Sequence, residues 1–225
     1  MTRPDRIGPV AGLLTLAFLL LNLFTTRSAP DPDSPTRQMV SELLEHRNAY
    51  IASAVFILLQ AFFLLIFVTA IASVVARDLW LGRLASLGGG IASAFAMASA
   101  ISLIAAVFTA DHGASAAAWG PLFFHSFFLA STGVPMAIFM LAIGIAAVSE
   151  RTLHRVLAWA CIPIGIGVTF GGLYGFGGEL DGGVFGAVWI VSGLTLFVWI
   201  IGVSIALLRR SRTSNSLSAA HPALG

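Results

Sequence analysis

Six long apolar stretches, separated by shorter polar connections, take up most of this chain. None of them contains a charged side chain, and each has about the 20 residues that a helix needs to cross a bilayer. The first stretch is longer than the apolar part of a signal peptide, and no small-residue cleavage site follows it, so it is interpreted as a membrane helix. The pattern predicts transmembrane helices at residues 7–24, 49–76, 84–110, 119–148, 156–176 and 184–208.

The connection between the first two stretches has an amphipathic pattern of its own. Ser34 followed by Pro35 is typical of a helix start. Apolar residues then fall on one face of a helix, while arginine, glutamate and other polar residues fall on the opposite face. The apolar residues are Met39, Val40, Leu43 and Leu44. We therefore expect a short amphipathic helix over residues 35–46, on the surface of the membrane and continuous with the second transmembrane helix.

These patterns predict an all-α polytopic membrane protein with a single domain. The six transmembrane helices and the amphipathic helix account for residues 1–212. The remaining residues, 213–225, are rich in serine, alanine and proline and are predicted to form a disordered cytoplasmic tail.

The composition agrees with a membrane protein. Hydrophobic residues make up 58% of the chain and charged residues 10%, whereas soluble domains carry about 25% charged residues. The basic isoelectric point comes from arginines at the ends of the apolar stretches, where they meet lipid head groups. The lipid bilayer is therefore the expected partner, nucleic acid is not, and no cofactor is predicted.

The arginines also predict the orientation of the chain. If the chain crosses the membrane six times, nine of them lie on the same side of the membrane: Arg3, Arg6, Arg77, Arg83, Arg151, Arg155, Arg209, Arg210 and Arg212. Only Arg27, Arg37 and Arg47 lie on the other side. The positive-inside rule places the side with nine in the cytoplasm, together with both termini. Because all 12 basic residues are arginine and alanine is abundant, we expect a GC-rich bacterial genome and a bacterial plasma membrane.

Small residues at every fourth position indicate close contacts between helices. The third stretch contains Gly90 on such a stripe, and the fifth contains Gly167, Gly171 and Gly175. Packing within the bundle and a homodimer face are both compatible with this spacing. Two prolines, Pro135 and Pro163, predict kinks in the fourth and fifth helices, because proline lacks the amide donor of a helical hydrogen bond.

Two of the polar side chains within the apolar stretches, Gln60 and His125, are candidates for function or packing. Gln60 lies near the middle of the second stretch, where a hydrogen bond between helices is the expected role. His125 lies near the start of the fourth stretch, which is longer than one crossing requires. We therefore expect His125 close to the outer head groups, as a histidine whose hydrogen bonds are satisfied.

The outer connections gather acids and histidines that could form a site. Glu42 and His46 are four residues apart and share a helix face, a spacing at which a carboxylate and an imidazole can bind one metal ion. Asp111 and His112 follow the third stretch, and His125 begins the fourth. The hypothesis that these five residues converge predicts an outer metal or ligand site. The chain contains no HExxH, GxSxG or GxxxxGK[ST] motif.

The layout as a whole resembles a broad group of uncharacterised bacterial six-helix membrane proteins. The resemblance rests on the six stretches, the Arg6-Ile7-Gly8 opening, the acidic outer connection that ends at Glu45-His46-Arg47-Asn48-Ala49, and Arg209-Arg210. It implies the fold and no activity. A non-enzymatic interaction or regulatory subunit, acting with a membrane protein partner or as a homo-oligomer, is the first hypothesis for function. The alternatives are a transporter or pore for a small neutral solute, and a metal-dependent enzyme or metal binder at the outer face.

Overall fold

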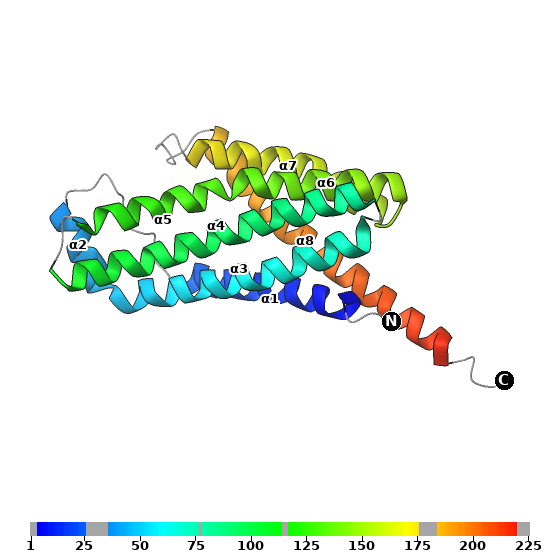
Figure 1. Ribbon diagram of the computed structural model, residues 1–225, viewed down its shortest axis with the longest axis horizontal. Coiled ribbons are helices and arrows are strands. Elements are labelled where there is room, and N and C mark those ends of the chain that lie inside the picture. The colour runs from blue at the N-terminus through cyan, green and yellow to red at the C-terminus, as the bar shows by residue number, and fades with distance from the viewer. Residues whose placement is uncertain (1–3, 26–35, 77, 114–116, 176–183, 220–225) are drawn as a thin grey trace.

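A computed structural model describes residues 4–25, 36–76, 78–113, 117–175 and 184–219 of the chain. These residues form eight helices (Figure 1): α1 Pro4–Thr25, α2 Thr36–Glu45, α3 Arg47–Val75, α4 Leu79–Asp111, α5 Trp119–Ser131, α6 Gly133–Glu150, α7 Arg155–Gly175 and α8 Val184–Ala219. Six segments are long and apolar enough to span a membrane, with α5 and α6 together forming the fourth. The predicted all-α polytopic fold with six membrane-spanning segments is confirmed.

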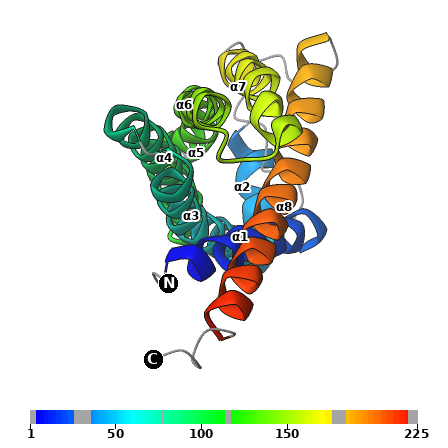
Figure 2. The same cartoon turned by 90° about the vertical axis from the view of Figure 1, so that its right-hand side faces the viewer.

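The spans form a closed ring when viewed along the bundle (Figure 2). Each helix packs against the next in the order α1, α3, α4, α6, α7, α8, and α8 returns to α1. Helix α5 packs mainly against α4 and also against α7. The start of α1 and the end of α8 lie at one end of the bundle and α2 lies at the other (Figure 1). We call these the arginine end, which carries Arg83, Arg151, Arg155, Arg209 and Arg210, and the α2 end.

A large apolar core fills the half of the bundle nearer the arginine end. Trp199 of α8 lies at its centre, where Phe67 of α3 and Phe139 of α6 each meet the indole edge to face, with ring centroids 6.3 Å away. The indole nitrogen donates a hydrogen bond to the carbonyl oxygen of Leu157 in α7, at 2.9 Å. One aromatic residue therefore joins four helices, and its polar atom is satisfied within the core.

The first and last spans meet at Gly12. A Cβ atom on this residue would lie 2.7 Å from the hydroxyl oxygen of Ser204 in α8 and 2.7 Å from the ring of Phe67. Such a distance is shorter than real Cβ contacts, so only glycine allows α1 to approach α8 this closely.

The predicted amphipathic helix is α2, and it covers a second apolar cluster at its end of the bundle. Met39 and Leu43 are completely buried against Tyr50 of α3 and Leu103 of α4. A turn at His46 separates α2 from α3, and the amide of Tyr50 still donates to the His46 carbonyl oxygen at 3.1 Å. The observed helix starts at Thr36; Ser34 and Pro35 lie outside the described residues.

The fourth predicted helix is divided into two at Thr132, three residues before Pro135, where the kink was expected. Helix α5 ends at Ser131 and α6 begins at Gly133, with Thr132 between them. Pro135 is the cause, because it has no amide hydrogen to donate to the carbonyl oxygen of Ser131. Pro163, in contrast, lies inside α7, which runs as one helix from Arg155 to Gly175.

The last helix continues beyond the point where a disordered tail was predicted. Helix α8 extends to Ala219, so residues 213–219 are helical and the predicted tail begins too early. No proline interrupts the sequence before Pro222, and a helix that is already formed in the membrane adds further residues without a new nucleation step. The rest of the tail, residues 220–225, lies outside the described residues.

The glycines of α7 pack inside the bundle. A Cβ atom on Gly167 would collide with the side chain of Ser192 in α8, and one on Gly172 would lie 3.0 Å from the carbonyl oxygen of Ala130 in α5. Gly171 is also buried. Gly90 of α4 has a looser setting, with Leu65 of α3 at 3.9 Å. Gly167 therefore supports packing within the chain rather than a homodimer face; Gly175 ends α7, and its surroundings are not described.

Candidate functional site

At the α2 end, Glu42 and His46 have separate neighbours. The carboxylate of Glu42 accepts a hydrogen bond from the hydroxyl of Tyr50, at 3.3 Å between Oε1 and the hydroxyl oxygen. The Nε2 atom of His46 lies 3.9 Å from Oε1 of Glu45. A shallow surface pocket of about 330 Å³ lies over this part of α2, lined by Gln38, Ser41, Glu42, Glu45 and His46. All of its lining comes from the nine consecutive residues Gln38 to His46.

Asp111 and His112 are also bound to local partners. Oδ2 of Asp111 lies 3.4 Å from Nη2 of Arg47, which begins α3, and both side chains are 41% exposed. The Arg47 guanidinium lies over the ring of Phe108, 5.8 Å from its centroid. Nδ1 of His112 lies 2.8 Å from the carbonyl oxygen of Phe108. This arrangement links α3 to α4, and an exposed ion pair of this kind contributes about 0–1 kcal/mol.

The predicted convergence of these residues is not formed. Within the described part of the chain, no group of three or more histidine, cysteine, aspartate or glutamate side chains is placed to hold a metal ion. The reason is that α2 packs its apolar face, with Met39 and Leu43, against α3 and α4, so its polar face lies on the other side, while Asp111 is already paired with Arg47. The five candidate residues thus lie in three separate places. Glu42 and His46 are at the surface of α2, Asp111 and His112 are at the end of α4, and His125 is in the interior of the bundle.

His125 lies in that interior, between α5 and α4. Its Nδ1 atom is 2.8 Å from the hydroxyl oxygen of Ser99 in α4 and 3.0 Å from the Ser99 carbonyl oxygen. Ser99 lies about 18 Å along the helix axis from the end of α4 at Asp111. His125 itself lies about 14 Å from the midpoint of the span that α5 and α6 form together, close to the edge of a hydrocarbon core about 30 Å thick. The depth of His125 relative to the head groups stays a prediction.

The Ser99–His125 pair joins two helices. The Ser99 hydroxyl donates a hydrogen bond to the backbone carbonyl oxygen of His125 at 2.9 Å, so its hydrogen is directed away from the imidazole. Ser99 is completely buried, and His125 is 6% exposed. A serine that attacks a substrate must give its proton to the base and must be reached by the substrate. The geometry thus describes a polar clamp between α4 and α5.

Removal of the hydrogen bonds between Ser99 and His125 is expected to lower the stability of the folded chain. We expect Ser99→Ala to lower the free energy of unfolding by about 1–2 kcal/mol, because it removes the hydroxyl contacts to both the ring and the backbone of His125. Ser93→Ala is the matched control. Ser93 is equally buried in α4, but its hydroxyl bonds only to Gly89 in the same helix. Unfolding in mixed micelles measures both variants; equal losses would contradict a role for Ser99 in joining the helices.

Gln60 does not show the role expected for it. The residue is partly buried in α3, and no hydrogen bond of its side chain is formed with any residue that the structure describes. The predicted bond between helices therefore remains without support.

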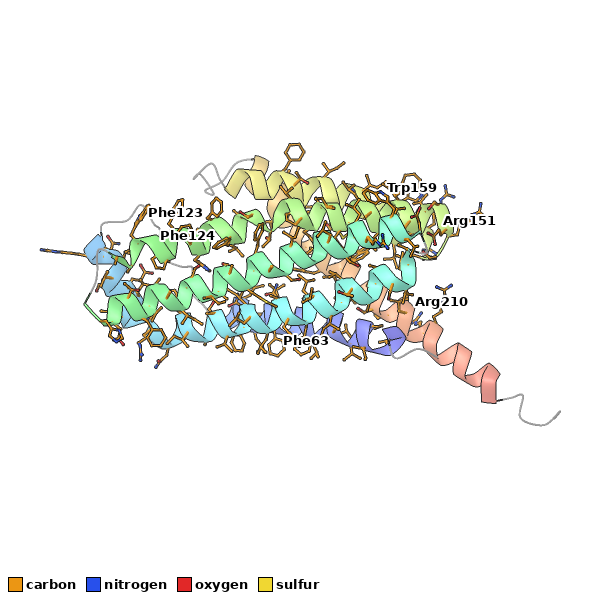
Figure 3. All side chains as sticks on the ribbon, viewed as in Figure 1. Phe63, Phe123, Phe124, Arg151, Trp159 and Arg210 are labelled. Atoms are coloured by element: carbon orange, nitrogen blue, oxygen red, sulfur yellow. The ribbon has the colours of Figure 1, made fainter. Side chains whose placement is uncertain are left out.

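An aromatic face on α5 is the main surface feature that sequence analysis missed. Trp119, Phe123 and Phe127 are spaced four residues apart, and their rings stack in succession, with centroids 5.3 and 6.3 Å apart. These three and Phe124 are each 40–51% exposed; Figure 3 shows Phe123 and Phe124 projecting from the bundle. The i, i+4 spacing was visible in the sequence. It carried no signal there because the whole stretch is apolar, so no polar side marks which residues face outward.

Comparison with known protein families, curated proteins and solved structures finds no match to this chain. The resemblance to other six-helix bacterial proteins therefore stays a prediction.

Proposed function

We propose that this chain is a non-enzymatic interaction subunit of a bacterial plasma membrane. Its aromatic face on α5, formed by Trp119, Phe123, Phe124 and Phe127, packs against a transmembrane helix of a second membrane protein. The stacked and half-exposed rings of this face are the observation that carries the proposal.

The contrast with α8 supports a protein partner. Helix α8 is also extensively exposed, but among its described side chains the large exposed ones are aliphatic: Ile190, Val191, Leu194, Val198, Ile201 and Ile205. Aliphatic side chains are sufficient for contact with lipid tails. Large, rigid aromatic side chains are instead concentrated at the centres of protein interfaces, where they bury much area at little conformational cost.

The Ser99–His125 clamp supports the proposal by fixing the direction of this face. Successive residues of a helix are rotated by 100°. His125 is therefore on the opposite side of α5 from Phe123 and Phe127, each two residues away. Its bonds to α4 hold α5 from behind, so the stacked rings are presented outward in one orientation before any partner arrives. Pre-organisation of this kind lowers the entropic cost of association.

Photo-crosslinking in native membranes tests the proposal. A benzophenone side chain placed at Phe123 is expected to form one discrete adduct with a different membrane protein. The same group at Val198, which is 69% exposed and the most exposed of the large apolar side chains described in α8, is the control and should react with lipid alone. Phe127→Leu, combined with the probe at Phe123, should reduce the protein adduct several-fold, because it removes a ring from the same stack while leaving an apolar surface.

Three outcomes would contradict the proposal. These are lipid adducts alone at Phe123, an adduct of the same size at Val198, or an adduct that Phe127→Leu leaves unchanged. An adduct with a second copy of the chain would mean that the aromatic face forms a homo-oligomer contact instead of binding a different protein.

A further inference from the structure

A cavity of about 550 Å³ opens at the arginine end between α6 and α7. Its lining combines two arginines with one tryptophan and small or apolar residues: Ala147, Val148, Arg151, Leu153, Arg155, Ala158 and Trp159. Arg151 and Trp159 are labelled in Figure 3 at this end of the molecule. The cavity is at the opposite end from α2 and is separate from the aromatic face of α5.

The charge of this cavity is uncompensated. Arg151 and Arg155 are both exposed, and neither forms a salt bridge with a carboxylate among the described residues. No acidic side chain belongs to the lining. Glu150, the nearest acid in the chain, has its Oε1 atom 3.0 Å from the amide nitrogen of Asp78, from which it accepts a hydrogen bond. The cavity thus offers two guanidinium groups to an anion.

The rest of the lining is apolar and continues onto the surface of the span. Trp159 is 51% exposed and Val156, on the neighbouring turn, is 67% exposed. A half-exposed tryptophan beside arginines is typical of the level at which a membrane span meets the head groups. The cavity therefore combines a charged part, formed by the two arginines, with an apolar part formed by Trp159 and its neighbours.

The loop that forms the rim is held in place from two sides. The hydroxyl of Thr152 donates to the carbonyl oxygen of Val75 in α3 at 3.0 Å. Nη1 of Arg210 in α8 donates to the carbonyl oxygen of Thr152 at 3.1 Å. The loop is thereby tied to two neighbouring helices, so the cavity exists before a ligand enters it.

We propose that this cavity binds the phosphodiester group of an anionic phospholipid from the leaflet at the arginine end. A guanidinium group matches two phosphate oxygens with two parallel N–H donors, and Arg151 and Arg155 provide two such groups in the lining of the cavity. The apolar lining selects a lipid over free phosphate, because the glycerol and upper acyl carbons of a lipid cover Trp159, Val148 and Ala158. Basic pockets between membrane helices bind acidic head groups by the same chemistry.

The test uses the purified full chain in a mild detergent, titrated with phosphatidylglycerol and with phosphatidylcholine. Bound lipid is counted by native mass spectrometry, and thermal unfolding is followed in parallel. Phosphatidylglycerol is expected to bind more tightly and to raise the melting temperature. Inorganic phosphate at the same concentration is expected to have no effect, which separates a lipid site from a phosphate site.

Two variants remove the charges in different ways. Arg155→Gln should weaken phosphatidylglycerol binding about fivefold, as expected for the loss of about 1 kcal/mol per arginine at an anionic surface. Arg151→Gly should have a similar effect while preserving the fold. Arg151 has a φ of 52° at the end of α6, a conformation that glycine adopts without strain, so this variant is expected to unfold no earlier than the wild type.

Arg83→Gln is the matched control, since it removes one exposed helical arginine at the same end but outside the cavity. It should leave the preference for phosphatidylglycerol unchanged. The proposal is overturned if Arg83→Gln weakens binding as much as Arg155→Gln, because the attraction would then depend on total charge alone. Equal affinity for the two lipids, or the same stabilisation by inorganic phosphate, would also overturn it.

Discussion

Gly133→Leu is expected to prevent the chain from reaching its folded state in membranes. A Cβ atom at this position would collide with the carbonyl oxygen of Val168 and lie 2.8 Å from the Cα atom of Gly172, both in α7. These are backbone atoms and cannot rotate away, unlike the end of a flexible side chain. Overpacking a well-packed core costs about 1–3 kcal/mol even where side chains can adjust. Separation of α7 from the junction of α5 and α6 should cost more.

Gly120→Leu provides the control for this prediction. Gly120 lies in the first turn of α5, and a Cβ atom there would meet nothing within 4 Å. Size-exclusion chromatography and thermal unfolding in detergent should show aggregation or loss of the folded peak for Gly133→Leu and a wild-type profile for Gly120→Leu. A folded Gly133→Leu variant of normal stability would mean that α7 does not pack on this junction.

A nearly all-or-none result is also expected for the orientation in the membrane. A reporter that is active only in the cytoplasm should work when it is fused after Arg212 and fail when it is inserted next to Asp111. The reason is that nine arginines flank one side of the spans and three flank the other. The structure places the start of α1 and the end of α8 at one end of the bundle and α2 at the other (Figure 1), as six crossings require.

A periplasmic reporter at the same positions should give the reverse pattern. An insertion beside Arg151, in the loop between α6 and α7, serves as a second cytoplasmic position within the bundle. Cytoplasmic activity at Asp111 would contradict the predicted orientation, although it would leave the six-helix fold as it is.

The helices could be predicted from the sequence because charged residues mark their ends. Arg47 begins α3, Asp111 ends α4 and Arg155 begins α7. Charges are costly in the hydrocarbon core, so their positions limit each span. Helix α2 could also be predicted, because its apolar and polar residues separate onto two faces. In α8 the charges of Arg209, Arg210 and Arg212 mark the end of the apolar stretch, but the helix continues to Ala219, because charges limit the membrane span and not the helix.

The candidate site could not be predicted for a related reason. Lipid and protein core are both apolar, so hydrophobicity does not show which side of a transmembrane helix faces inward. The depth of His125 depends on the offset between α4 and α5, and the exposure of Phe123 and Phe127 depends on the rotation of α5. Similarly, Glu42, His46 and Asp111 are close to the same membrane surface, but only the path of α2 decides whether they meet. These are tertiary quantities that the spacing of residues along the chain does not contain.

The contact between α1 and α8 has a consequence for biosynthesis. A ribosome delivers α1 to the membrane first and α8 last, yet Gly12 of α1 packs directly against Ser204 of α8. Until α8 emerges, this face of α1 has no neighbour other than α3 and is in contact with lipid. The ring therefore closes only after the last span has been inserted, and a nascent chain that stops before α8 remains open along this seam.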